Sequence, residues 1–531
     1  MGKRIVCFFV AQTVVLTFLY FRVWKIIGEE NLIDVGEQQN TYTLSMYSMR
    51  ANIYDRNFEK MVNEEPLYAS AVVPSQTDER FFEHFSYSSS KELSSLIAAG
   101  KPFLYTTDYD PSGASGAEVH RYFKRYSENQ LAGHIIGYTD SSFVGAYGIE
   151  KAYNDYLKEN GETLKISYSV NARGNFLEGT GVKKVTLGKS EAGIVLTIDK
   201  EIQKIAEEAG KTIKKGAIVI MDPYSGDILA SASFPSLNLN DLSSAVDDPN
   251  SPFINRAFSH YSIGSVFKIV LCAAALENGM DENEIFECKG SIALADTSFR
   301  CHKLSGHGSL DMLSAVEQSC NPYFIELGRK LGFQKIYDIA EKLGFGKGTD
   351  FGNGLVSLSG NLPQKEDIKT VGDLANFSFG QGSLTATPVQ LAAMVSAVVN
   401  DGNCPSPRLI KGFAEAVSGE LQNENAIKTE RAFSASTARK IQKLMISAVE
   451  NGTGILALPT YGSAGGKTGS AETGQYSSDG TQILNALFCG FYPATDPKYS
   501  IVVLLEDGVS GSVSAGPIFK EICEMLYATG C

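Results

Sequence analysis

Positive charge is in short supply in this sequence. The chain of 531 residues has 47 Lys and Arg against 60 Asp and Glu, which gives a formal net charge of -13. Proteins that bind nucleic acid carry basic patches, so this balance argues against nucleic acid as a partner. The sequence also lacks internal repeats and low-complexity tracts. Its length exceeds that of one ordinary domain and predicts about two to four.

Long apolar runs are scarce as well, apart from one near the N-terminus. Residues 5–21, IVCFFVAQTVVLTFLYF, follow two basic residues and precede Arg22, Trp24 and Lys25. The run is near the lower end of the range of about 17 to 25 residues that cross a bilayer, and its flanks suit the two interfaces. A cleaved signal peptide is the alternative, but no small-residue cleavage site follows. We predict a single-pass anchor within residues 1–26, with the N-terminus cytoplasmic and the remainder extracytoplasmic.

The character of the sequence changes near residue 190. Residues 27–190 are polar and rich in Tyr and Ser, with short mixed segments, which favours an elongated α+β pedestal. In residues 191–531 an apolar helix face is followed by GAIVIM and DILASAS, which the turn DPYSG joins as a hairpin. NALFCGFYPA and KYSIVVLLED form a second strand pair near the C-terminus, before a closing helix, PIFKEICEMLYA. Strands from both ends with helices between them predict an α+β domain whose sheet is assembled across the sequence.

One short stretch places a serine three residues before a lysine. SVFKIVLCAAALENG, from Ser265, predicts an apolar helix that ends at Asn278 and Gly279. Ser265 falls at the helix N-terminus and Lys268 one turn later, so both side chains share a face. A serine hydroxyl is a weak nucleophile unless a base takes its proton, and a lysine can be that base when burial or another cation lowers its pKa. A helix cap with a surface lysine would give the same pattern.

Two further segments reduce the weight of that simpler explanation. AVEQSCNPYFIELG places Ser319 and Asn321 between two apolar helical stretches, and YGSAGGKTGSAETG places Lys467 and Thr468 before the last strand pair, where a strand is expected. Each segment alone could be a cap or a glycine loop. Together and in this order, S-x-x-K, S-x-N and K-T-G form the triple of serine β-lactamases and penicillin-binding proteins.

With these motifs the chain resembles the class B penicillin-binding proteins of the elongation, division or sporulation type. The family has the penicillin-binding, serine β-lactamase-like fold, an antiparallel sheet flanked by helices. One departure is Ile263 where the family usually has proline before Gly-Ser, which loosens the turn but keeps Ser265 and Lys268. Further matching segments are RANIYDRN (50–57), AGHIIGYTD (132–140), GIEKAYNDYL (148–157), LTID (196–199), MDPYSGDILASASFPS (221–236) and FGQGSLTATPVQLA (379–392).

The resemblance implies a catalytic role for each motif. Ser265 would attack the penultimate D-Ala carbonyl of a stem peptide that ends in D-Ala-D-Ala, and Lys268 would take its proton. Ser319 would relay a proton to the leaving amine, and Asn321 would orient Lys268 and the substrate amide. Lys467 would keep Lys268 neutral and bind the substrate carboxylate.

The remaining roles implied by the resemblance concern substrate binding. Thr468 would bind the carboxylate with Lys467, Gly469 would let the strand approach the peptide, and the N–H groups of Ser265 and Ser470 would form the oxyanion hole. An amine from a neighbouring strand would then complete a cross-link, and β-lactams would be trapped on Ser265. The expected partner is a multi-spanning glycan polymerase. A non-catalytic β-lactam sensor or scaffold, a β-lactamase and a D,D-carboxypeptidase stay as alternatives.

A second cluster of reactive side chains precedes Ser319. ECKGSIALADTSFRCHKLSGHGSLD holds Cys288, Cys301, His302 and His307, two of only six histidines in the chain. Three readings fit these residues: a Cys288–Cys301 disulfide across a hairpin, a structural zinc site, or unpaired residues. The zinc site would use both thiolates and one or both of His302 and His307, with or without a carboxylate such as Asp281 or Asp296. Serine acyl transfer needs no cofactor, so any of these would be structural and could brace one wall of the active site.

Overall fold

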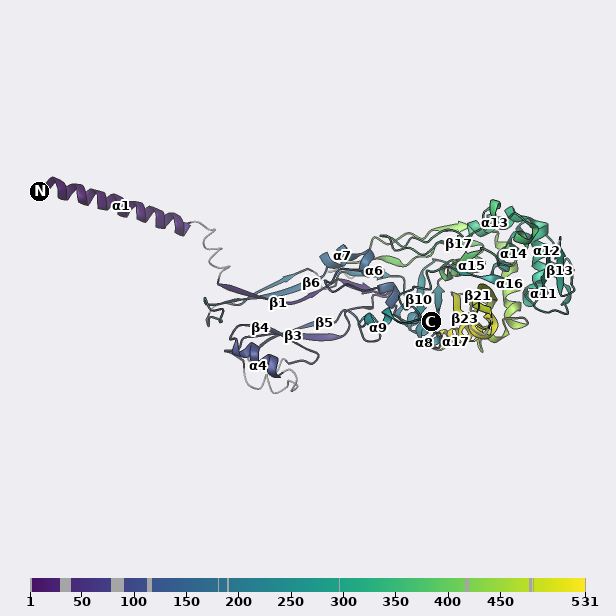
Figure 1. Ribbon diagram of the computed structural model, residues 1–531, viewed down its shortest axis with the longest axis horizontal. Helices are drawn as coiled ribbons and strands as arrows, with labels where there is room; N and C mark the ends of the chain where they lie inside the picture. The colour runs from purple at the N-terminus through teal and green to yellow at the C-terminus, as the bar shows by residue number, and fades with distance from the viewer. Residues whose placement is uncertain are drawn as a thin grey trace. The chain divides into compact units, whose positions relative to one another are not determined.

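A computed structural model describes most of the chain (Figure 1). The described residues are 2–28, 40–77, 90–111, 117–179, 181–188, 191–295, 297–415, 420–476, 480 and 482–530, with the side chains of 90–92 left out. They form two compact units that alternate along the sequence: residues 1–50, 65–125 and 160–190 in the first, and residues 51–64, 126–159 and 191–531 in the second. The division by function into anchor, pedestal and transpeptidase domain at residues 26 and 190 stays a prediction.

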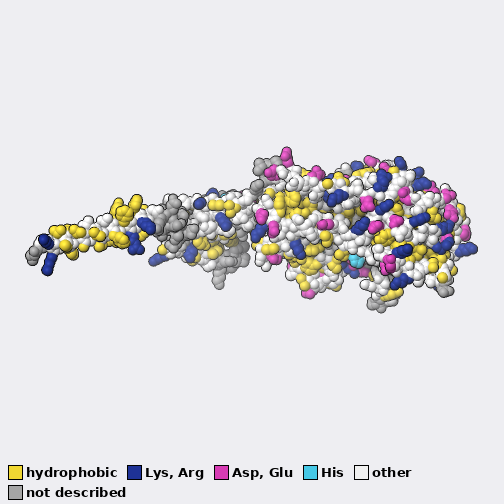
Figure 2. Space-filling view, turned by 90° about the horizontal axis from the view of Figure 1, so that it is seen from above, with side chains coloured by type: hydrophobic (Ala, Val, Ile, Leu, Met, Phe, Trp, Pro, Cys, Tyr) yellow, Lys and Arg dark blue, Asp and Glu magenta, His cyan; other side chains and the backbone are white. Residues whose placement is uncertain are grey.

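The first unit begins with the apolar helix α1 (Gly2–Gly28), whose side chains are all exposed. Apolar side chains cover it and basic side chains gather toward its ends (Figure 2). It is long and apolar enough to cross a membrane, as the sequence predicts. The aromatic rings of Phe21 and Trp24 meet edge to face near its C-terminal end, with centroids 5.9 Å apart.

The rest of the first unit consists of two three-stranded antiparallel sheets with a small shared core. Leu44, Met46, Ala69 and Ile166 meet in this core. The helix α4 (Ser90–Ala98) belongs to this unit and was not predicted from the sequence. The sheets are β1 (Thr41–Met49), β6 (Glu162–Ser169) and β7 (Lys183–Leu187), and β4 (Phe103–Thr107), β3 (Pro66–Val72) and β5 (Ala117–Phe123).

In the second unit, a four-stranded sheet contains strands from residues 51–64 and from the chain after residue 190. Strand β2 (Asn52–Tyr54) pairs in parallel with β8 (Gly193–Leu196), followed by β18 (Ile410–Ala414) and β19 (Leu421–Gln422). The paired residues of β2 and β8 are 141 positions apart in the sequence, so the segments that contain RANIYDRN and LTID are strand neighbours. Beside them in the same unit are α5 (Gly133–Ile136), α6 (Gly148–Ala152) and α7 (Asn154–Glu159).

The main sheet of the second unit has five antiparallel strands in the order β10-β9-β23-β22-β21. The predicted hairpin and the predicted second strand pair are both confirmed, and β23 pairs with β9 to join them. The strands are β9 (Gly216–Met221), β10 (Ile228–Phe234), β21 (Gly465–Tyr476), β22 (Gln482–Tyr492) and β23 (Tyr499–Gly508). Strand β21 is the last in this order, so one of its edges has no partner strand among the described residues.

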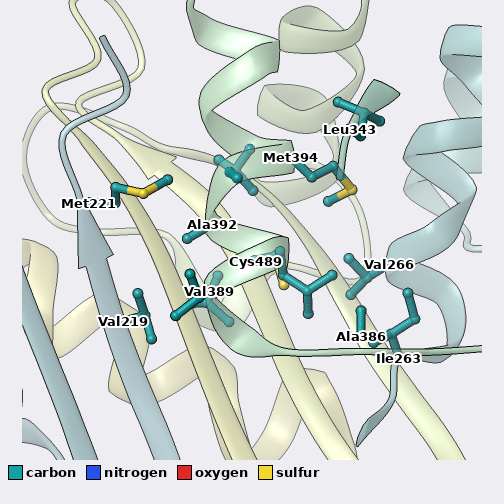
Figure 3. Packing of buried hydrophobic residues seen from close by; sticks show 14 of the residues in the cluster. Val219, Met221, Ile263, Val266, Leu343, Ala386, Val389, Ala392, Met394 and Cys489 are labelled. Atoms are coloured by element: carbon teal, nitrogen blue, oxygen red, sulfur yellow. The ribbon is translucent and has the colours of Figure 1, made fainter. Parts of the chain in front are cut away.

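The strands β9, β22 and β23 are buried on both faces over most of their length, which is why they are nearly continuous apolar runs. Alternate residues such as Val219 and Met221 face the buried helix α15 (Pro388–Val399), as the close view shows (Figure 3). Their neighbours Ile218 and Ile220 pack instead with α8 (Lys200–Ala209) and α17 (Gly516–Thr529).

Further helices and short strands complete the second unit. The helices are α9 (Ser243–Val246), α10 (Lys268–Glu277), α11 (Met312–Glu317), α12 (Asn321–Leu331), α13 (Phe333–Lys342), α14 (Val371–Ser378) and α16 (Ala435–Glu450). Short helical turns are η1 (Gly264–Phe267), η2 (Lys365–Asp367), η3 (Ile455–Ala457) and the π-turn η4 (Gly511–Ala515). Short strands are β11 (Tyr261–Ser262), β12 (Phe286–Cys288), β13 (Ser291–Leu294), β14 (Thr297–Arg300), β15 (Gly308–Leu310), β16 (Thr385–Ala386), β17 (Asn403–Pro405) and β20 (Thr429–Arg431).

Candidate active site and metal cluster

The predicted helix after Ser265 is present, and its first turn is tighter than an α-helix. Ser265 lies in the 3-10 turn η1, which leads directly into α10. Gly264 precedes it with a φ of 55°, and a Cβ there would come within 2.8 Å of the Ser470 carbonyl oxygen. A side chain at position 264 would therefore collide with β21, so glycine is what lets Ser265 sit beside that strand. The Ser265 side chain is half-buried.

Lys268 is fully buried at the start of α10. Its Nζ donates hydrogen bonds to the Ser319 carbonyl oxygen at 2.8 Å, to Ser319 Oγ at 3.2 Å and to Asn321 Oδ1 at 2.7 Å. It also lies 5.4 Å from the centre of the Phe324 ring. Burial, followed by the charge of Lys467, lowers the pKa of Lys268 well below its ordinary value. A pKa lowered in this direction favours the neutral amine, which is the form that can accept a proton.

Ser319 connects the two lysines of the motifs. It lies between α11 and α12 with a φ of 49°, a left-handed conformation that serine rarely adopts. The conformation aims its hydroxyl at the lysines, because Ser319 Oγ accepts from Lys268 Nζ at 3.2 Å and from Lys467 Nζ at 3.0 Å. Asn321 is the first residue of α12, and Pro322 follows in the first turn, where its fixed φ suits a helix.

The third motif lies on the strand β21, as the sequence predicts. Lys467 is 1% exposed, and burial lowers its pKa to about 7. Its Nζ also donates to Thr468 Oγ1 at 3.2 Å, and the Thr453 hydroxyl lies 3.2 Å from that same oxygen. A Cβ on Gly469 would come within 2.7 Å of the Ile263 carbonyl oxygen, so the turn and the strand touch there.

Ser470 lies two residues beyond Thr468, and its hydroxyl accepts a hydrogen bond from the Gly511 N–H at 3.0 Å. All eight predicted catalytic and substrate-binding residues are therefore found on η1, α10, the α11–α12 connection, the start of α12 and β21. A base and its nucleophile are expected to share a hydrogen bond, but among the described residues Lys268 and Ser265 do not. Such bonds often tighten only when substrate is bound.

The cysteine and histidine cluster has a different membership from the one predicted. Ligand atoms of Cys288, Cys301, His307 and Cys320 all lie within 4.8 Å of one another, and such a group could hold a metal ion. His302 is outside the group, although its Nδ1 lies 4.0 Å from Cys301 Sγ. The sequence analysis did not include Cys320, because this residue lies beyond the segment that holds the other three and inside the S-x-N motif.

The Cys288–Cys301 disulfide, one of the three readings that the sequence left open, is not formed, since the described cysteines are free thiols. The hairpin that was expected between Cys288 and Cys301 is present as β13 and β14. Asp281 instead accepts hydrogen bonds from Asn283, and Asp296 lies outside the described residues. A hydrogen bond with Cys320 lowers the pKa of the Cys301 thiol, which favours a thiolate in the cluster.

The fold and the three motifs are those of one family. Residues 216–524 match the penicillin binding protein transpeptidase domain, which is more than half of the chain, and the chain therefore belongs to that family. Its long relatives place it among the class B penicillin-binding proteins, the peptidoglycan D,D-transpeptidases.

Two of these relatives and one solved structure illustrate the match. Stage V sporulation protein D of Bacillus subtilis is 29% identical over 92% of this chain and 78% of its own length. The peptidoglycan D,D-transpeptidase MrdA of Acinetobacter baumannii is 30% identical over 80% of this chain and 66% of its own. A chain from a structure entitled "Structural coordination of polymerization and crosslinking by a peptidoglycan synthase complex" shares the fold, with a TM-score of 0.71, 23% identity, and coverage of 99% and 98%.

Proposed function

We propose that this chain cross-links peptidoglycan stem peptides through an acyl-enzyme on Ser265. The observation that carries the proposal is the meeting of two buried lysines at one hydroxyl, Ser319 Oγ, 3.2 and 3.0 Å from their Nζ atoms. A buried cation is costly, and two adjacent ones more so, hence at least one amine is neutral. This arrangement supplies a base and a fixed positive charge beside one serine.

In the first half-reaction, Ser265 Oγ attacks the carbonyl carbon of the penultimate D-Ala while Lys268 takes the hydroxyl proton. The N–H groups of Ser265 and Ser470 stabilise the oxyanion of the tetrahedral intermediate. The C–N bond then breaks, and the proton passes from Lys268 through Ser319 Oγ to the leaving amine. The terminal D-Ala departs, the ester on Ser265 remains, and Lys268 is again neutral.

Substrate binding uses the neighbouring groups. Protonated Lys467 and the Thr468 hydroxyl bind the terminal carboxylate, a charge-assisted contact. Asn321 orients the substrate amide, and Gly469 leaves the strand open to a peptide backbone. The edge of β21 without a partner strand suits an extended peptide, which would add to the sheet.

In the second half-reaction, an amine of a neighbouring strand attacks the ester carbonyl, and Lys268 moves the proton of that amine to Ser265 Oγ. The C–O bond breaks and an amide cross-link forms. A β-lactam would acylate Ser265 in the same way and stay attached. The apolar helix α1 would anchor the protein with its N-terminus in the cytoplasm, and a membrane-spanning glycan polymerase would supply the glycan. A chain of a peptidoglycan synthase complex, described for its coordination of polymerization and crosslinking, shares this fold.

We further propose that the cluster of Cys288, Cys301, His307 and Cys320 binds a structural zinc ion. Ligands about 2.0 to 2.3 Å from a tetrahedral zinc ion lie about 3.8 Å apart, so the 4.8 Å limit of this group needs only a small contraction. His307 would bind through Nδ1, which lies 3.4 Å from Cys301 Sγ. The ion would link the chain segments that carry these four residues, and no catalytic step needs it.

Turnover separates this function from its alternatives. The full chain, in detergent, is incubated with a lipid-linked glycan strand whose stem peptides end in D-Ala-D-Ala, and the muropeptides are separated by mass. Cross-linked dimers that require Ser265 support the proposal. Loss of D-Ala without dimers would identify a D,D-carboxypeptidase, no turnover a sensor or scaffold, and rapid hydrolysis of penicillin a β-lactamase.

A further inference from the structure

A cavity in the second unit lies apart from both sites described above. It is lined by residues from the end of α13, from α15 and from β17, whose labels can be found in Figure 1. Its volume is about 510 Å³, within the range of about 300 to 1,000 Å³ that is usual for small-molecule sites. No catalytic or substrate-binding residue of the active site lines it, and no residue of the cysteine and histidine cluster does. The cavity is therefore a separate candidate binding site.

One wall of the cavity is held in place by a buried glutamine on α15. Gln390 Nε2 donates hydrogen bonds at 2.8 to 2.9 Å to the carbonyl oxygens of Gly344, Lys347 and Ser359. These bonds fix the loop that follows α13 to the buried helix α15. The cavity is thus largely formed before any ligand binds, as is usual for small-molecule sites.

The charged side chains around the cavity are mostly basic, although the whole chain has a net charge of -13. The lining contains four cations and two carboxylates: Lys342, Lys347, Arg408, Lys428, Asp350 and Glu430. The charge of Arg408 is offset by an ion pair with the buried Asp227. Lys347 and Lys428 are exposed, and neither forms an ion pair with a carboxylate of the described residues. Two lysines without counterions can together bind a doubly charged anion.

One carboxylate of the lining is available as well. Glu430 on β20 is paired across the strands with Cys404 of β17, and its side chain makes no hydrogen bond or ion pair among the described residues. Asp350 differs, because its Oδ1 accepts a hydrogen bond from the Gly352 N–H at 2.9 Å. An ionised carboxylate only accepts hydrogen bonds, so it suits the hydroxyl groups of a ligand and not its anionic group. The lining therefore fits a ligand that carries both.

We propose that this cavity binds a sugar phosphate, that is, a phosphate monoester with neighbouring hydroxyl groups. The phosphate group has a charge of about -1.5 to -2 at neutral pH, and it binds the ammonium groups of Lys347 and Lys428. Glu430 accepts hydrogen bonds from the sugar hydroxyls. A phosphodiester, as in a polyol phosphate polymer, has a single charge, so the two lysines favour the monoester. The proposal does not depend on the chemistry proposed for Ser265.

Isothermal titration calorimetry of the full chain in detergent tests the proposal with glucose 6-phosphate, inorganic phosphate and glucose. We expect a saturable site for glucose 6-phosphate and none for uncharged glucose. The double variant Lys347→Gln, Lys428→Gln should bind glucose 6-phosphate at least about tenfold more weakly, because two charge-assisted contacts are lost. Lys335→Gln, an exposed lysine of α13 outside the cavity, should bind it like the wild type. No saturable binding, or unchanged binding by the folded double variant, overturns the proposal.

The variant Glu430→Ala separates recognition of the hydroxyls from recognition of the phosphate alone. It should bind glucose 6-phosphate about fivefold more weakly and inorganic phosphate no more weakly than the wild type does. Tighter binding of both ligands would show that Glu430 only repels the anion, and the assignment of a sugar would be wrong.

Two comparisons exclude other sources of the signal. Glycerophosphoglycerol, a diester with one charge, should bind at least about fivefold more weakly than glucose 6-phosphate, and equal or tighter binding would identify a polymer instead. Prior treatment with benzylpenicillin should leave the titration unchanged, because the cavity contains no active-site residue. Loss of binding after that treatment would place the anion at Lys467 and overturn the proposal.

Discussion

Replacing Lys268 with methionine removes a buried amine at the centre of the site while keeping an unbranched side chain of similar length. The Nζ atom donates to the Ser319 carbonyl oxygen at 2.8 Å and to Asn321 Oδ1 at 2.7 Å. Each acceptor left unpaired costs about 1 to 3 kcal/mol. Methionine offsets part of this loss, because an apolar side chain is not penalised by burial as an amine is. We expect the free energy of unfolding to fall by about 2 kcal/mol.

The effect on chemistry should be much larger. A positioned general base contributes about 10²- to 10⁴-fold to a rate. Loss of Lys268 should therefore slow acylation of Ser265 by at least about 100-fold, equal to about 2.7 kcal/mol of barrier. Non-covalent binding of the β-lactam should change little, because Lys467 and Thr468 remain.

The assay is a time course of fluorescent penicillin binding at several concentrations, which separates the initial binding constant from the acylation rate. Thermal unfolding of the same samples verifies that the variant is folded. Lys335→Met, an exposed lysine on α13, is the control and should acylate like the wild type. An acylation rate for Lys268→Met within about tenfold of the wild type would refute Lys268 as the base.

Three further predictions follow from the site. Burial lowers the pKa of Lys467 to about 7, so this lysine is charged below that pH and neutral above it. Acylation by a β-lactam should therefore decline as the pH rises through 7 in stopped-flow measurements. A β-lactam ester, which has no free carboxylate to bind Lys467, should show no such decline. Elemental analysis should find one zinc ion per chain. The Cys301→Ser variant should lose the ion, and its melting temperature should fall by about 5 °C. Cys523→Ser, which changes a cysteine outside the cluster, should retain the metal. Gly469→Ala should slow penicillin acylation at least about tenfold, because the new Cβ would displace the turn that carries Ser265, and a wild-type rate would contradict this contact.

Much of the fold could be predicted from sequence because its signals are local. The strands beside DPYSG are apolar runs bounded by a turn, and both pairs of the main sheet are found where predicted. The α1 helix is apolar along its length and is not buried among other elements. The helix α4 was missed, since its short segment SKELSSLIA has mixed polarity.

The motifs of the site could be recognised, but their geometry could not. The spacing of S-x-x-K predicts that Ser265 and Lys268 share a helix face, whereas the bonding of Lys268 to Ser319 depends on how α10 packs against the α11–α12 connection. The left-handed conformation of Ser319 has no sequence signal, because serine rarely adopts it. Cys320 joins Cys288 and Cys301 through tertiary packing, and spacing along the chain does not report such contacts.

The central claim is that Ser265 is the nucleophile, and intact mass tests it most directly. The full chain and its Ser265→Ala variant are incubated with benzylpenicillin and weighed after minutes. We predict a single adduct of the mass of one penicillin on the wild type, persistent over that time, and none on the folded variant. A folded wild type without an adduct, or an adduct that survives in Ser265→Ala, would contradict the account.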